Sequence, residues 1–309
     1  MKNIRIRTLV IICALAVVAG AASLAARDSR GQSRPRKTTA PLPDAKNELV
    51  KPTVLVMDRK PATSALTAAA TQNAALRNEL SWTFGSKPQH GWFLYDLLIG
   101  QTLNAAPYIS TNDFTNAVAV WQKQNGLNAS GVLDEHSWKA LVARWQGDRL
   151  KDKTPATPDQ LLLAPSSDFY DPARLAPLRQ VERTTYAAYK QMLAAAIADP
   201  ALHLGHTTAG ELAPSEKYLK IVSAFRSREY QEQLRRQSPN AGSAGLAINS
   251  PHFTGRALDL YVGGDPVDTK DSNRAVQVST PVYRWLVQNA RRFGFRPYFY
   301  EPWHWEYVG

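Results

Sequence analysis

The sequence predicts an α+β fold in a protein of about two domains. Its 309 residues are too many for one small core, and a hydrophobic content of 44% is enough for a sizeable packed interior. Residues 88–147 show only helical patterns. Residues 167–309 mix helical patterns with short strands and lack the strand–helix alternation of a parallel sheet. We therefore expect a small helical domain followed by an α+β domain.

The first 26 residues are typical of a targeting segment. Lys2, Arg5 and Arg7 precede an apolar run over residues 9–26, which ends in small residues that fit a signal-peptidase site. We expect a cleaved signal peptide. The alternative is an uncleaved membrane anchor, because about 20 apolar residues span a bilayer. In both cases the rest of the chain would be exported to the periplasm or cell envelope, and an anchor would hold it at the inner membrane.

Charge and cysteine content narrow the classes of function. Of the net charge of +11, +3 precedes the apolar run and +5 lies in residues 27–60, which leaves +3 for residues 61–309. Such a basic tail suits an anionic envelope surface better than a nucleic acid, and we expect no nucleic-acid partner. Cys13, inside the apolar run, is the only cysteine. A mature protein without it would have no disulfide, thiol nucleophile or cysteine-ligated metal.

Two segments are predicted to be linkers. Residues 27–87 are rich in basic residues, proline and alanine, and the prolines would break any long helix. One short helix is predicted around Ala65–Leu80. Residues 148–166 contain three prolines and several charges, and continuous globular sequence follows them.

Residues 88–147 contain two helical patterns. Apolar residues at helical spacing form one face of each predicted helix: Phe114, Ala117, Val118 and Trp121, then Trp138, Leu141, Val142 and Trp145. Ser110 and Asp134 are predicted N-caps. The stretch DFTNAVAVWQKQNGLNASGVLDEHSWKAL resembles the three-helix peptidoglycan-binding module of cell-wall hydrolases. That resemblance implies peptidoglycan as a binding partner.

Helices and strands follow one another irregularly after residue 167. The patterns predict helices over Thr184–Ala198, Ser227–Arg236 and Pro281–Phe293, and strands over Tyr218–Phe225 and Ala257–Val262. An aromatic run near the end of the chain is expected to lie mostly in the core.

Two pairs of metal-compatible residues occur in this half of the chain. A reversal at Gly255 would bring His252 to Asp259 in the next predicted strand, and Glu301 and His304 would share one face of a turn. A catalytic zinc site needs about three protein ligands. A ligand set of His252, Asp259 and His304 leaves Glu301 as an unligated carboxylate, able to accept a proton from water.

Three motifs resemble those of a known family. Ser250 to Asp259 fits S-x-H-x-x-G-x-A-x-D, Glu301 and His304 fit E-x-x-H, and Ser223 to Gln231 is similar to S-x-[YF]-R-S-x-x-x-Q. Residues 168–309 thus resemble the D-alanyl-D-alanine carboxypeptidases of the vancomycin-resistance type, within the LAS metallopeptidases. The resemblance implies a small antiparallel-sheet zinc peptidase domain with flanking helices.

The same resemblance implies roles for individual residues. His252, Asp259 and His304 would hold one zinc ion per chain, and Glu301 would be the general base. Arg226 would bind the substrate carbonyl, its developing oxyanion or a terminal carboxylate. The further substrate-binding candidates are Gln231, Ser250 and Trp303. The connection GFRPYFYE, which ends at Glu301, is shorter than is usual in the family, so the pocket wall there would differ.

The predicted function is zinc-dependent hydrolysis of peptide bonds next to D-alanine in peptidoglycan stem peptides, as a D-alanyl-D-alanine carboxypeptidase. A cross-link-cleaving endopeptidase, a zinc amidase and a non-catalytic wall-binding scaffold are the alternatives. The scaffold would be expected to lack a ligand or the base, and the Arg226 segment favours peptide ends over the amidase bond. His203 and His206 are interpreted as an exposed loop pair. We expect residues 165–309 to cleave small soluble peptides by themselves.

Overall fold

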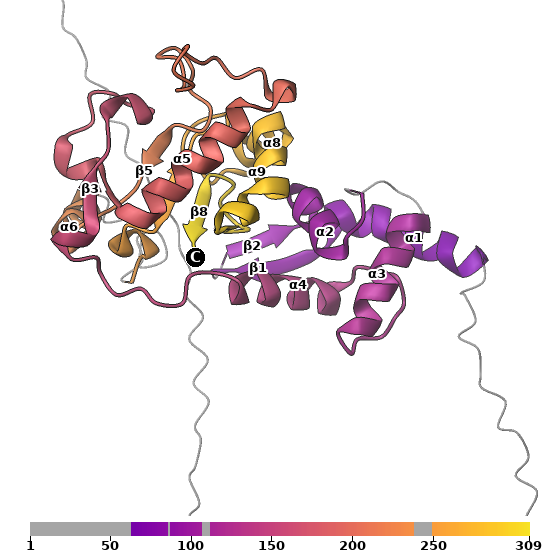
Figure 1. Cartoon of the computed structure of the whole chain (residues 1–309). Helices are drawn as coiled ribbons and strands as arrows, with labels where there is room; N and C mark the ends of the chain where they lie inside the picture. Colours follow the sequence, from indigo (N-terminus) through magenta and orange to yellow (C-terminus); the bar gives the residue numbers. More distant parts are fainter. Residues whose placement is uncertain (1–62, 86, 107–111, 238–248) are drawn as a thin grey trace, which may run out of the picture.

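The computed structural model describes residues 63–85, 87–106, 112–237 and 249–309 (Figure 1). Its helices are α1 (Thr63–Glu79), α2 (Asp96–Leu103), α3 (Asn112–Gln124), α4 (Glu135–Gly147), α5 (Arg183–Ile197), α6 (Arg228–Gln237), α8 (Asp271–Ser279) and α9 (Pro281–Asn289). Its strands are β1 (Ser81–Phe84), β2 (Lys87–His90), β3 (Leu161–Leu163), β4 (Gln180–Glu182), β5 (Ile221–Ser223), β6 (Ala257–Leu260), β7 (Phe295–Pro297) and β8 (His304–Tyr307). The α+β prediction is confirmed.

Three predictions fall wholly or partly outside these residues: the targeting segment 1–26, the linker over residues 27–62, and the Ser110 cap. Among the residues that the structure describes, none of the helices has the length and apolar character needed to cross a bilayer.

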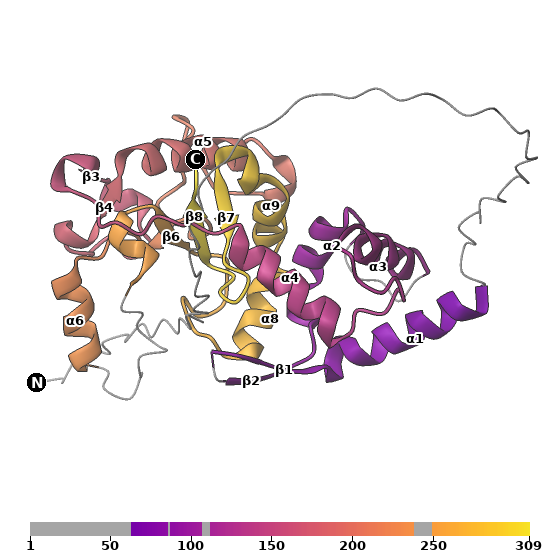
Figure 2. The same cartoon turned by 90° about the horizontal axis from the view of Figure 1, so that it is seen from below.

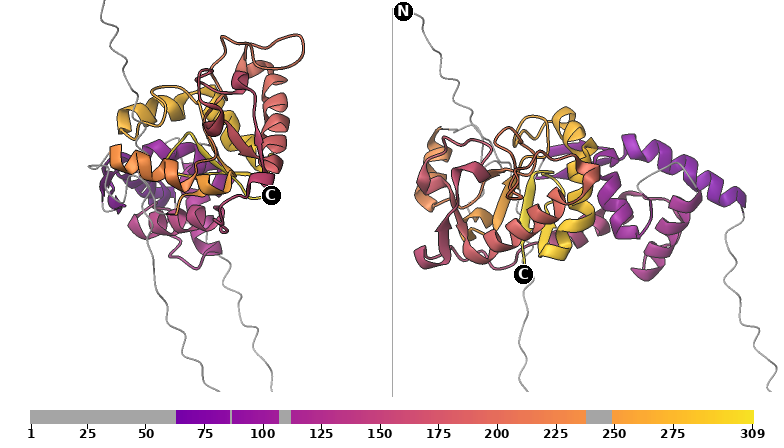
Figure 3. Two further views of the ribbon diagram at one scale, coloured as in Figure 1. Left: turned by 90° about the vertical axis from the view of Figure 1, so that its left-hand side faces the viewer. Right: turned by 45° about the horizontal axis from the view of Figure 1, so that its top comes forward.

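The helical unit, which we define as residues 63–147, lies at one end of the molecule (Figure 3). The predicted faces of α3 and α4 are buried, including Trp121, Trp138 and Trp145. The Asp134 side chain accepts a hydrogen bond from the Ser137 N–H at 2.8 Å, which confirms it as the N-cap of α4. These contacts make the helical unit a folded part of the molecule.

The predicted linker 27–87 differs from the structure in its last part. Residues 63–79 form α1, and β1 pairs with β2 in an antiparallel hairpin. The fully buried Asn73 joins α1 to the α3–α4 loop, because its Nδ2 donates to the Gly131 carbonyl at 2.8 Å and its Oδ1 accepts from the Leu133 N–H at 2.7 Å. The helical unit therefore begins about 25 residues earlier than the pattern of apolar residues indicates, at α1 rather than residue 88.

The second half of the chain is built on a four-stranded antiparallel sheet with the order β5-β6-β8-β7. Side chains alternate between its two faces. Leu258 and Trp305 are paired in register on one face, where Tyr283 of α9 contacts Trp305 with 6.4 Å between ring centroids. Asp259 and His304 are paired on the opposite face. One face of the sheet is thus core, and the other carries the polar residues of interest.

Aromatic side chains join the two halves of the molecule, and Phe299 makes several of these contacts. Phe299 precedes β8 and packs among Phe84, Tyr95 and Trp145 of the helical unit, at centroid distances of 4.9, 5.5 and 5.7 Å. Beyond α4 the chain runs directly along the sheet (Figure 2), and the predicted linker 148–166 contains β3, which pairs with β4. The two halves therefore share one hydrophobic core.

Candidate metal centre

Three local structures bring the predicted ligands together. His252 lies in a 3₁₀ turn, η7 (Pro251–Thr254), which ends at Gly255 with a φ of +67°. A Cβ on residue 255 would lie 2.9 Å from the Glu182 backbone nitrogen, so the reversal needs glycine. The chain then enters β6, whose Asp259 pairs with His304 of β8. The turn and the strand register place all three side chains at one point.

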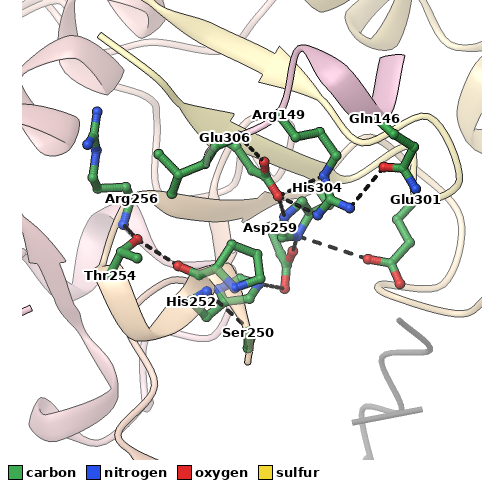
Figure 4. Close-up of polar contacts among 12 residues, drawn as sticks. Gln146, Arg149, Ser250, His252, Thr254, Arg256, Asp259, Glu301, His304 and Glu306 are labelled. Atoms are coloured by element: carbon green, nitrogen blue, oxygen red, sulfur yellow. Dashed lines mark hydrogen bonds and ion pairs between the residues drawn. The ribbon is translucent and has the colours of Figure 1, made fainter. Parts of the chain in front are cut away.

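The geometry of this cluster suits a metal ion. One potential ligand atom from each of His252, Asp259 and His304 lies within 4.8 Å of the others, and all three residues are buried. Asp259 Oδ1 is 2.9 Å from His304 Nδ1, and Asp259 Oδ2 is 3.3 Å from His252 Nε2 (Figure 4). Although burial raises the pKa of Asp259, the two histidines lower it far below its usual range, so the carboxylate is ionised.

The remaining nitrogen of each imidazole is occupied. His252 Nδ1 lies 2.7 Å from the Ala224 carbonyl oxygen, which can only accept, so Nδ1 carries the proton and Nε2 has a free lone pair. Buried Nε2 makes no hydrogen bond among the described residues. His304 Nε2 lies 3.2 Å from Glu306 Oε1, which leaves Nδ1 toward Asp259. Such outer partners are usual for metal-binding histidines, and the site fits a metal ion.

Without a metal the two histidines differ in protonation. Burial and the charge of Arg226 lower the pKa of His252 to about 4. Burial also disfavours the charged form of His304, but its hydrogen bonds to Asp259 and Glu306 outweigh this and raise the pKa to about 9. A metal ion must therefore compete with a proton for His304 Nδ1.

Glu301 lies beside this cluster. Its Oε2 is 4.0 Å from His304 Nδ1, and both carboxylate oxygens are buried without a hydrogen-bond partner among the described residues. Burial, opposed by the charge of His304 and helped by that of Asp259, raises the pKa of Glu301 to about 7. A carboxylate with this pKa can accept and return a proton near neutral pH.

Arg226 does not stand free in the site as a substrate-binding residue would. Its Nη2 donates to Asp259 Oδ2 at 3.0 Å and its Nε donates to Ser223 Oγ at 3.1 Å. The buried guanidinium therefore holds a ligand carboxylate in place. Arginine is suited to this because its donors form a rigid, planar fork.

The other predicted substrate-binding residues are buried in the structure. Ser250 caps η7, since its Oγ accepts from the His252 N–H at 3.3 Å. Gln231 and Trp303 are 3% and 1% exposed. Contacts of these three residues with a peptide remain predictions. His203 and His206 are exposed and form no metal-binding group within the described part of the chain.

Residues that the sequence analysis missed complete the centre. Glu306 follows His304 by two positions and so lies on the same face of β8, a signal that strand alternation could have given. Arg149, just after α4, donates from Nε to Glu306 Oε1 at 3.0 Å. Burial is outweighed by the hydrogen bonds from His304 and Arg149, which lower the pKa of Glu306 to about 2. No sequence pattern connects residues this far apart.

A pocket of about 610 Å³ lies between the 170–178 segment, Val222 of β5, Tyr230 of α6 and Pro266. Val222 is an extra residue in β5, because Ile221 pairs with Leu260 and Ser223 pairs with Asp259. Such a bulge can turn Val222 toward the face that carries Asp259, and Val222 lines the pocket.

Arg174 also lines this pocket. Its Nε donates to the Leu178 carbonyl at 3.0 Å, and its Nη atoms form no hydrogen bond or ion pair with described residues. The pKa of Arg174 is lowered overall, because burial and the charge of Arg226 outweigh Tyr230 and Asp259, which raise it. A guanidinium with unused donors therefore lies within electrostatic reach of the metal centre.

Comparison with known families agrees with this geometry. Residues 179–309 match the family model VanY, D-alanyl-D-alanine carboxypeptidase. This part of the chain is a VanY domain. The match contains the metal-facing residues and Glu301, whereas the helical unit, Arg149 and Arg174 lie outside it. No curated protein matches the chain. The match supports a peptidase activity for residues 179–309.

Proposed function

We propose that this protein is an exported zinc carboxypeptidase that removes the terminal D-alanine from peptidoglycan stem peptides. The observation that carries the proposal is the buried cluster of His252, Asp259 and His304. Beside it lies the carboxylate of Glu301, which has no hydrogen-bond partner among the described residues. His252 Nε2, His304 Nδ1 and the Asp259 carboxylate would hold the ion. When bound, zinc would polarise the scissile carbonyl and make water a stronger nucleophile.

The chain's own groups supply the proton transfer and the orientation. Glu301 would take the proton of the attacking water and deliver it to the leaving amine, for which a pKa of about 7 is well matched. Arg226 and the Ala224 carbonyl keep Asp259 and His252 in their orientations. The buried setting strengthens each of these electrostatic interactions.

Arg174 favours the carboxypeptidase over the cross-link endopeptidase. A carboxypeptidase substrate ends in a carboxylate. The Nη atoms of Arg174, which bind none of the described residues, could hold it by two charge-assisted hydrogen bonds. Arg226 is less available for this task, because Asp259 and Ser223 already occupy two of its nitrogens. In an endopeptidase the corresponding position would have to admit a continuing chain.

The helical unit and residues 1–26 extend the proposal. Sequence resemblance supports a peptidoglycan-binding role for residues 88–147, and the apolar run over residues 9–26 supports export or anchoring in the envelope. Binding of the wall by the helical unit would raise the local concentration of substrate at the metal centre.

Digestion of purified muropeptides, followed by mass spectrometry, tests the proposed activity. The metal-free protein and the zinc-loaded protein are compared on monomers that end in D-Ala-D-Ala and on cross-linked dimers. We expect zinc-dependent loss of one terminal D-alanine from monomers. Conversion of dimers to monomers without that loss would identify an endopeptidase. No cleavage of either substrate would support a binding scaffold.

A further inference from the structure

A segment outside the VanY match reaches the metal centre. Arg149 and Leu150 follow α4, the last helix of the helical unit, and both contact the buried carboxylate of Glu306. Figure 4 shows Arg149 beside Glu306. Arg149 donates from Nε to Oε1 at 3.0 Å and its Nη2 contacts the same oxygen, while the Leu150 N–H donates to Oε2 at 2.8 Å. Both oxygens of Glu306 are therefore held from outside the VanY domain.

Glu306, held in this way, in turn orients His304, one of the three proposed metal ligands. Its Oε1 also accepts from His304 Nε2 at 3.2 Å, and that contact determines which imidazole nitrogen faces Asp259. The Glu306 side chain is fully buried. A buried carboxylate is strongly unfavourable without a partner, and Arg149 and Leu150 supply the partners that hold Glu306 beside His304.

Arg149 is itself held firmly. Its guanidinium lies 3.9 Å from the ring centroid of Tyr298, and its Nη1 donates to Gln146 Oε1 of α4 at 3.1 Å. The side chain is 11% exposed. Tyr298 is in turn tied to the site, because its N–H donates to the His304 carbonyl at 2.9 Å. The end of α4 and the start of β8 thus form one rigid group of contacts around Glu306.

We propose that Arg149 and Glu306 are positioning residues through which the helical unit completes the metal centre of the VanY domain. This inference rests on the proposed metal site. Arg149 fixes Glu306, Glu306 fixes the tautomer of His304, and the tautomer presents Nδ1 to the ion. The domain matched by the family is then not a self-sufficient metal site, because Glu306, the outer partner of His304, is itself held by Arg149 and Leu150 from outside the match.

The competing interpretation is that Arg149–Glu306 is an ion pair that only fastens the two halves together. A second arginine at the same interface, Arg274, provides a matched control for this interpretation. Arg274 is also buried between the halves and donates to the Tyr95 hydroxyl at 3.0 Å and to Gln89 Oε1 at 3.3 Å, but it contacts no metal-facing side chain. A purely structural role predicts that Arg149 and Arg274 variants behave alike.

The test measures zinc affinity and stability separately in the full chain. Arg149→Gln, Arg149→Lys, Glu306→Gln and Arg274→Gln proteins are prepared metal-free and titrated with zinc against a chromophoric chelator. Thermal unfolding is followed with and without zinc. Because loss of an outer partner usually weakens metal binding by about 10–100-fold, we expect a loss of about tenfold or more in Arg149→Gln and Glu306→Gln. Arg149→Lys, which keeps one charged donor, should lose less.

The imidazole ¹⁵N shifts of His304 in the zinc-loaded protein give a second readout. They should show a single fixed tautomer in the wild type and a changed Nε2 signal in Arg149→Gln. Arg274→Gln should lower the unfolding temperature without changing zinc affinity or these shifts. The proposal is overturned if Arg149→Gln and Glu306→Gln bind zinc within twofold of the wild type and only lose stability, as Arg274→Gln does. A wild-type protein that binds no zinc would instead overturn the metal site itself.

Discussion

Glu301 and His304 lie three residues apart, with Glu301 Oε2 4.0 Å from His304 Nδ1, yet their surroundings differ. His304 is hydrogen-bonded to Asp259 on one side and to Glu306 on the other. Both oxygens of Glu301 lack a hydrogen-bond partner among the described residues. This difference fits His304 as a metal ligand and Glu301 as the general base. Mutants of the two residues should therefore differ in zinc content.

His304→Ala should abolish stoichiometric zinc binding and activity together. Glu301→Gln should keep near-stoichiometric zinc but lose about a hundredfold or more in kcat, because the amide cannot accept the water's proton. Metal analysis of the two purified mutants beside their rates distinguishes the roles. Full activity in Glu301→Gln would show that another group is the base.

The raised pKa of Glu301 predicts two pH effects. A base must be ionised, so kcat/KM should rise with pH up to an apparent pKa at or below about 7, because bound zinc can only lower the value of the metal-free protein. In metal-free protein the folded state binds the Glu301 proton more tightly than the unfolded state. Its contribution to stability is therefore lost as pH rises from about 4.5 to about 7.

Denaturant unfolding of metal-free wild type and Glu301→Gln at several pH values measures the second effect. The mutant should gain stability relative to the wild type across that window and keep the gain at higher pH. A constant difference between the two proteins would mean that Glu301 titrates normally.

Arg226→Lys is expected to affect the metal as well as the rate. A lysine cannot donate to Asp259 and Ser223 together, so Asp259 should lose orientation and zinc affinity should fall severalfold along with activity. Zinc titration and steady-state kinetics on the same preparation test this. Normal zinc affinity with low activity would return Arg226 to a direct role on the substrate.

Arg174→Gln should raise KM for peptides that end in a free D-alanine carboxylate, with a smaller effect on kcat. Peptides with an amidated terminus should be cleaved poorly by the wild type and be nearly unaffected by the substitution. Equal KM values for wild type and Arg174→Gln would exclude Arg174 from carboxylate binding.

Phe299→Ala should destabilise the whole protein by about 3–5 kcal/mol, because the ring is buried among aromatic side chains of the helical unit. A fragment of residues 165–309 would expose Phe299 and lack Arg149. Contrary to the expectation from sequence, we expect that fragment to be poorly soluble and to bind zinc weakly. Unfolding curves and zinc titrations of the fragment and of residues 63–309 test this comparison.

The parts of the site that lie close together in sequence could be predicted. His252, Gly255 and Asp259 form one turn and strand, and their spacing alone indicates the reversal. The pairing of Asp259 with His304 is a strand register, which the family resemblance supplied and local spacing could not. Arg149 and Glu306 are brought together only by packing of the two halves, so nothing in either neighbourhood predicts their contact.

The short helix predicted around Ala65–Leu80 is confirmed as α1, but its place in the helical unit and the β1–β2 hairpin were not predicted, for a similar reason. α1 is rich in alanine and threonine and has no clear apolar stripe, and its key contact is made by a buried asparagine, Asn73. β2 contains Pro88, which argues against a central strand but is tolerated in a two-stranded hairpin. Composition therefore favoured a linker with one short helix, whereas tertiary contacts join that helix and a hairpin to the helical unit.

The packing of Phe299 against the helical unit also fixes the distance between the helical unit and the metal centre. If the helical unit grips a glycan strand, the metal centre cannot sweep freely around that anchor, as it would on a flexible tether. The protein would then cleave only those stem peptides that lie at one fixed distance from the bound glycan strand. Wall regions with a different spacing between strands would be held but left uncut.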